Sequence, residues 1–149
     1  MTPKAYVAEH GQDYQSRTLW LNQELKDGMS EILAHPYLKT RVRYWIGPQA
    51  SIWLLDEIGK EKPISFGVHV VNNQIRNIEV LAFRESRGDE IRHPFYTQQF
   101  LGLKLTEDAQ LDQHVDGITG ATYSVRAMSK IARVALWLDA QVQNDNKSR

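Results

Sequence analysis

The sequence predicts an α+β fold, in which an antiparallel sheet is accompanied by an N-terminal helix and a C-terminal helix. Three observations lead to this: an apolar face at helical spacing early in the chain, alternation of apolar and polar residues between 40 and 82, and a second helical pattern near the end. Hydrophobic residues make up 42% of 149, which is enough for one core. We expect a single domain over residues 17–143, with a flexible arm at 1–16 and a polar tail at 144–149.

An apolar face indicates the first helix, which we expect from about Thr18 to His35-Pro36, where proline disfavours helical backbone in the residue before it. The residues of that face are Leu21, Leu25, Met29 and Ile32. Residues 40–46 then alternate in the manner of a half-buried strand, and residues 51–55 form a second short apolar run. Residues 56–60 resemble a turn.

The clearest supersecondary pattern is an antiparallel hairpin between residues 64 and 85. Apolar residues alternate over 64–70 and again over 78–82. Asn72-Asn73 lies between them, and asparagine tolerates the positive φ of tight hairpin turns.

A charged loop is expected over 85–93, followed by a short helix between Pro94 and Gly102. Residues 103–113 are expected to be irregular or to form a short strand. The final helix is expected to begin near Ser124, because the apolar residues that follow fall on one stripe. These residues are Val125, Met128, Ile131, Ala135, Leu138 and Val142.

Composition excludes several classes of chemistry. Eighteen basic residues balance eighteen acidic ones, so no global field attracts nucleic acid. The chain has no cysteine, which excludes disulfides, thiolate nucleophiles and iron–sulfur ligation. The five histidines show no metal-binding spacing, and no apolar run is long enough to span a bilayer. We expect no metal site, no nucleic-acid partner and no membrane span.

The segment that precedes the final helix is suited to contact with a phosphate. Thr119 and Thr122 flank Gly120 and Ala121, where little side-chain bulk covers the backbone. The unpaired N–H groups and positive dipole end of the following helix favour an anion. From local physics alone, a glycine turn with Ser124 as an ordinary N-cap remains the alternative.

Asp116-x-x-Thr119-Gly120-Ala121-Thr122 resembles the flavinylation motif of the FMN-binding domain family, found in subunits of the sodium-translocating NADH:quinone reductase and of the Rnf complex. Residues 67–70, 84–91 and 100–102 also resemble soluble members of that family, so the similarity covers roughly residues 55–138. In the family, the last threonine of the motif is esterified to the phosphate of FMN. The resemblance therefore implies that Thr122 is the acceptor.

Other cofactor-binding residues are expected around Thr122. The hydroxyl groups of Thr119 and Ser124 are candidates to donate hydrogen bonds to phosphate oxygens, and Tyr123 is a candidate to flank the cofactor. Asp116 is expected to orient the loop or to serve recognition by the attaching enzyme, with the capping of a turn as the alternative.

The charged loop supplies further candidates. Glu85 and Gly88 align with the loop of the family. Arg84, and with it Arg87 and Arg92, could place a cation near the flavin and tune its potential, whereas a solvated surface charge is the competing interpretation. His93 and His114 lie near the site in sequence, with structural or surface roles as the alternative.

The resemblance implies an FMN-dependent electron carrier rather than a self-sufficient enzyme, with no catalytic side chain of its own. It further implies a separate magnesium-dependent flavin transferase, redox partners on both sides and a location outside the bacterial cytoplasm, although no export signal is visible. The sequence contains no GxG motif, so it lacks the fingerprint of a dinucleotide-binding site that would indicate direct NADH binding. The alternatives are a module that binds FMN reversibly and, less in keeping with the sequence, a hydrolase that uses Thr122 or Ser124 as nucleophile.

Overall fold

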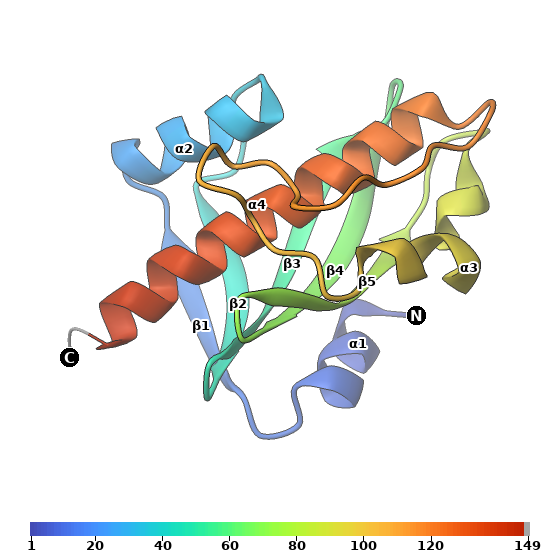
Figure 1. The fold of residues 1–149 in the computed structure, drawn as a ribbon. Helices are drawn as coiled ribbons and strands as arrows, with labels where there is room; N and C mark the ends of the chain where they lie inside the picture. The colour runs from blue at the N-terminus through green and yellow to red at the C-terminus, as the bar shows by residue number, and fades with distance from the viewer. Residues whose placement is uncertain (148–149) are drawn as a thin grey trace.

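A computed structural model describes residues 1–147 as one antiparallel sheet with helices on both faces (Figure 1). The five strands are hydrogen-bonded in chain order. They are β1 Gln15–Trp20, β2 Arg41–Gly47, β3 Ala50–Ile58, β4 Pro63–Val71 and β5 Gln74–Ala82. The longer helices are α1 Pro3–His10, α2 Gln23–Leu33 and α4 Thr122–Lys147, and the short ones are η1 Asp89–Arg92, α3 Pro94–Thr97 and η2 Gln98–Phe100. The α+β prediction is confirmed.

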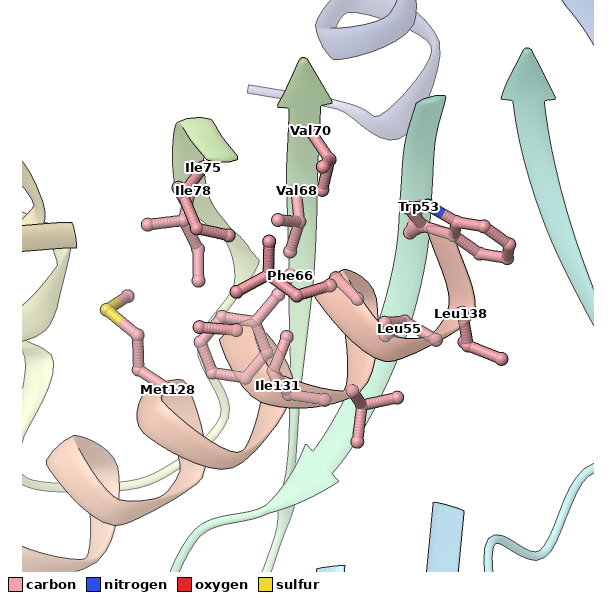
Figure 2. Close-up of a cluster of buried hydrophobic side chains, with 14 of the residues drawn as sticks. Trp53, Leu55, Phe66, Val68, Val70, Ile75, Ile78, Met128, Ile131 and Leu138 are labelled. Atoms are coloured by element: carbon pink, nitrogen blue, oxygen red, sulfur yellow. The ribbon is translucent and has the colours of Figure 1, made fainter. Parts of the chain in front are cut away.

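The main core lies between the sheet and α4. Phe66, Val68 and Val70 alternate along β4 and point toward α4, which contributes Met128 and Ile131 (Figure 2). All five side chains are fully buried. Burial of large apolar side chains contributes about 1.5–3 kcal/mol each, so this layer is the main source of stability and fixes the direction of α4.

Helix α2 packs against α4 on the same face of the sheet. Its N-cap is Asn22, whose side chain accepts a hydrogen bond from the N–H of Leu25 at 2.9 Å. A Cβ atom added to Gly28 would overlap the ring of Trp137, so this glycine permits the close approach of the two helices. The helix ends at Leu33.

Helix α1 covers the opposite face, where the sequence suggested a loose arm. Thr2 caps the helix, and the fully buried Tyr6 ring lies over Gly67 of β4. The hydroxyl of Tyr6 donates to the side-chain oxygen of Asn77 at 2.9 Å. A single aromatic anchor in a glycine notch gives no periodic pattern, which explains why this helix was not expected.

Three other boundaries differ from expectation. The first helix was expected from Thr18, but residues 15–20 form edge strand β1, which leaves only Leu19 half-buried against the core. Strand β3 continues through Ile58, past the turn expected at 56–60. The expected polar tail is partly helical, because α4 extends to Lys147, while residues 148–149 lie outside the described residues.

The hairpin was predicted correctly. Asn72 and Asn73 have φ of 53° and 66°, and the turn joins β4 to β5. The short helical segment between Pro94 and Gly102 is also present, and residues 103–113 are irregular apart from a bridge between Leu105 and Leu111.

Candidate functional site

Helix α4 begins without a side-chain cap. Its first residue is Thr122, two residues before the expected start near Ser124. The N-cap is Ala121, whose carbonyl accepts a hydrogen bond from the N–H of Val125 at 2.9 Å. Alanine has no side-chain acceptor, so it cannot satisfy the N–H groups of the first turn. The alternative role of Ser124 as N-cap is therefore wrong. The free N–H groups and the helix dipole make this end attractive to an anion.

The loop before α4 leaves its backbone accessible. Gly120 has φ of +84°, and a Cβ atom added there would meet nothing within 4 Å. Ala121 is buried and donates its N–H to the carbonyl of Ile118 at 3.0 Å, which holds the turn in place. Thr119 and Thr122 are both exposed. The hydroxyl of Thr122 is consequently open to a modifying enzyme.

A second loop packs against the start of α4. Gly88 has φ of +94°, and a Cβ atom there would overlap the hydroxyl oxygen of Ser124, which is 3% exposed. Glu85 fixes the same loop, because its carboxylate accepts from the N–H of Glu61 at 2.8 Å and from the N–H of Lys62. These backbone hydrogen bonds hold the pKa of Glu85 below its ordinary value.

The two loops enclose a pocket of about 300 Å³, here called the phosphate pocket after the group that the sequence predicts beside it. It is lined by Lys60, Glu85, Ser86, Arg87, Gly88, Gly120, Ala121, Tyr123 and Ser124. The structure thus brings together two segments that are far apart in the sequence. Lys60 and Ser86 were not expected among the lining residues. Lys60 lies in the β3–β4 turn, and the hydrogen bonds from this turn to Glu85 place it at the site.

Four expected residues do not line this pocket. Thr119, on the loop, and Thr122, on the first turn of α4, are sequence neighbours of the lining residues Gly120, Ala121 and Tyr123. Asp116 is exposed, with a carboxylate oxygen 3.2 Å from Nε2 of His114. Arg84 donates to the carbonyl of Pro63 at 2.8 Å, on the neighbouring strand.

The remaining candidates from the charged loop lie elsewhere. Arg92 lines a separate depression beside β5, and the exposed His93 ring lies 5.9 Å from that of Phe95. Neither touches the phosphate pocket.

A buried charge cluster lies farther along α4 and was not expected. Glu57 is 4% exposed, and its carboxylate oxygens lie 2.8 Å and 2.9 Å from Nε2 of His35. Lys130 of α4 lies 3.7 Å from the same carboxylate. Strand alternation would have placed Glu57 on the buried face with Trp53 and Leu55, had β3 been extended past residue 55.

The described residues contain no group of three or more histidine or acidic side chains arranged to hold a metal ion. Between residues 1 and 147, no helix has the length and apolar character needed to cross a bilayer.

The start of α4 fits a phosphate-bearing cofactor on physical grounds, because the uncapped helix end, the open Gly120 and the exposed Thr122 lie together there, at the edge of the phosphate pocket. Residues 59–137 match the family model described as the FMN-binding domain, and this range holds both loops and most of α4. No curated protein matches the chain. Since the matched range covers more than half of the sequence, the chain belongs to the FMN-binding domain family, with FMN as its cofactor.

Proposed function

We propose that the chain is an electron carrier whose FMN is attached to Thr122 by a phosphoester bond. The observation that carries this proposal is the position of Thr122, exposed as the first residue of a helix whose N-terminus has no side-chain cap. A phosphate esterified to this hydroxyl would lie close to the free N–H groups of the first turn. The positive dipole end of α4 would stabilise its negative charge.

Attachment needs an outside enzyme, because a threonine hydroxyl is a weak nucleophile. We propose a magnesium-dependent flavin transferase with FAD as donor. The Thr122 oxygen forms a bond to the phosphorus of the FMN half, the diphosphate bond breaks, AMP leaves and the hydroxyl proton is released. The exposed carboxylate of Asp116, six residues before Thr122, is available for recognition by that enzyme.

When bound, the flavin supplies the redox chemistry, and the chain supplies its position and electrostatic surroundings. The sequence has no cysteine to provide a second redox group, so electrons must enter and leave through partner proteins. Redox partners on both sides and a location outside the bacterial cytoplasm are part of the proposal. A phosphate tether suits this role, because it retains the cofactor in both oxidation states.

The test measures intact mass and visible absorbance after denaturation, on protein made with and without a co-expressed flavin transferase. We expect added FMN mass and retained yellow colour in the native chain and in Thr119→Ala, a matched control from the same exposed loop. Thr122→Ala should lose both. Flavin that denaturation removes from every variant would instead indicate a module that binds FMN reversibly, and the absence of any flavin in an export-competent host with the transferase would contradict the proposal.

A further inference from the structure

Two further hollows follow one another from the phosphate pocket, and together they are here called the groove. It consists of a hollow of about 220 Å³ that shares Tyr123 with the phosphate pocket, and of a second hollow of about 280 Å³ beyond it. The nearer hollow is lined by His35, Glu57, Ile58, Gly59, Tyr123, Arg126, Ala127 and Lys130. The farther one shares three of these residues and adds apolar side chains of the α2–β2 connection, Pro36, Tyr37 and Leu38, together with Pro63.

The hydrogen bonds of His35 favour the cationic form of its ring. Its Nδ1 lies 2.8 Å from the carbonyl oxygen of Pro36, and its Nε2 lies 2.8 Å from the carboxylate of Glu57. A carbonyl and a carboxylate are acceptors, so the doubly protonated imidazole, in which both ring nitrogens donate, satisfies both contacts. Burial lowers the pKa of His35, but the hydrogen bonds to Glu57 and Pro36 outweigh it and leave the pKa above its ordinary value.

The groove therefore has an excess of positive charge. The charged groups that face His35 are Glu57 from β3 and Lys130 from α4, so one carboxylate is shared by two cations. Arg126 adds a third cation at the nearer end, where its guanidinium lies 5.9 Å from the centre of the Tyr123 ring. Within the described part of the chain, the one other acidic side chain that lines either hollow is Asp56, which is paired with Lys39 at 2.7 Å.

We propose that the isoalloxazine ring of FMN lies in this groove, against Arg126, Lys130 and the His35–Glu57 pair. The inference rests on the proposed function, since it takes the phosphate to be held at the start of α4. Thr122 and Lys130 are about 12 Å apart along the helix axis at 1.5 Å per residue. The ribityl chain, which joins phosphate to ring, and the ring itself together cover a distance of this order.

The groove also matches the chemistry of the ring. A planar aromatic system with one polar and one apolar edge would contact Tyr123 and the cations near α4, and apolar side chains toward Leu38, which is 91% exposed. Because the oxidised ring is neutral and the two-electron-reduced ring is anionic near neutral pH, positive charge here favours the reduced form.

This placement uses residues that the family match does not contain. His35, Pro36, Leu38 and Glu57 all precede residue 59, where the match begins. The α2–β2 connection of this particular chain would thus set the potential of the flavin, by positioning one wall of the groove and one of its charges.

The first test is a redox titration of the flavin-loaded full chain, with Lys130→Gln and Arg126→Gln compared with Lys4→Gln. Lys4 is an exposed lysine on α1, across the sheet from the groove, and serves as the matched control. In the flavin-loaded protein, we expect each groove variant to lose about tenfold in the preference for reduced over oxidised flavin, which is a potential about 30 mV lower for a two-electron couple. Lys4→Gln should keep the native potential.

The second test uses the imidazole NMR signals of the unloaded chain with added FMN. The signals of His35 should shift, whereas those of His69, on the α1 face of the sheet, should not. If flavin loads on the chain but the groove variants keep the native potential and His35 does not respond, this inference is overturned and the proposed function stands. If no flavin associates with the chain by either route, both are overturned.

Discussion

The contact between Gly88 and Ser124 joins the two loops of the phosphate pocket, and its replacement gives the sharpest test of the site geometry. Gly88 and Gly120 both have positive φ, at +94° and +84°, but their surroundings differ. A Cβ atom at Gly88 would overlap the Ser124 hydroxyl oxygen and lie 3.1 Å from the Ser124 Cβ. The same atom at Gly120 would meet nothing within 4 Å.

The two alanine variants share one cost and differ in the other. Left-handed backbone costs a non-glycine residue roughly 1–2 kcal/mol, and this applies to both positions. Overpacking adds about 1–3 kcal/mol, and this applies to Gly88 alone. We therefore expect Gly120→Ala to lower the free energy of unfolding by about 1–2 kcal/mol and Gly88→Ala to lower it by about 2–5 kcal/mol.

Urea denaturation at constant slope measures both losses as changes in midpoint. A double-mutant cycle isolates the contact, because Ser124→Ala removes the nearest atom and should return part of the loss in Gly88→Ala. Equal losses in the two glycine variants, or no recovery with Ser124→Ala, would refute the conclusion that the two loops touch at this point.

Three further predictions concern the rest of the molecule. Burial, with the charges of His10 and Arg76, lowers the pKa of His69 from 6.5 to about 4. The free energy of unfolding should therefore fall by up to about 3 kcal/mol between pH 7 and pH 4, and His69→Gln should flatten this dependence in urea denaturation across pH. The raised pKa of His35 has the opposite sign: its stabilisation is complete below pH 6.5 and is lost as the pH rises through the folded-state value, which an NMR titration of the ring and the pH dependence of unfolding should both report. Gly67→Ala would place a Cβ atom 2.7 Å from the Tyr6 ring and should cost about 1–3 kcal/mol by urea denaturation, with a smaller loss in a Tyr6→Ala background.

The elements that could be predicted from the sequence are those whose apolar residues recur at a regular spacing. Alternation identified the β4–β5 hairpin, and the apolar stripe identified α4, because both elements bury one continuous face in the main core. Strand β1 and helix α1 lack such a face. Strand β1 is an edge strand with mostly exposed side chains, and α1 is held by Tyr6 in the notch over Gly67. Contacts of this kind depend on tertiary structure and leave no period in the sequence.

The site divides in the same way. The motif from Asp116 to Thr122 is local, so its loop could be located before the structure was known. The second wall at Gly88 followed only from family resemblance, and its contact with Ser124 is a feature of the folded chain. The charged residues of the groove come from three separate segments, the α2–β2 connection, β3 and α4. The alternation that places Glu57 inward was obscured by the charged residues around it.

The residues at the start of α4 lower the stability of the helix but leave its first N–H groups free for a ligand. An alanine N-cap leaves the helix about 0.5–2 kcal/mol less stable than serine, threonine, asparagine or aspartate would. Those side chains, however, would occupy the first-turn N–H groups, and aspartate would also repel a phosphate at the same end of the helix. Ala121 keeps the N–H groups free beside the Thr122 hydroxyl, and the long core of α4 supplies the stability that the cap does not. On this reasoning the small residues of the motif matter for the donors that they leave exposed. In the proposed placement, the groove beyond Tyr123 would give the ring a defined environment that the exposed loop alone would not provide.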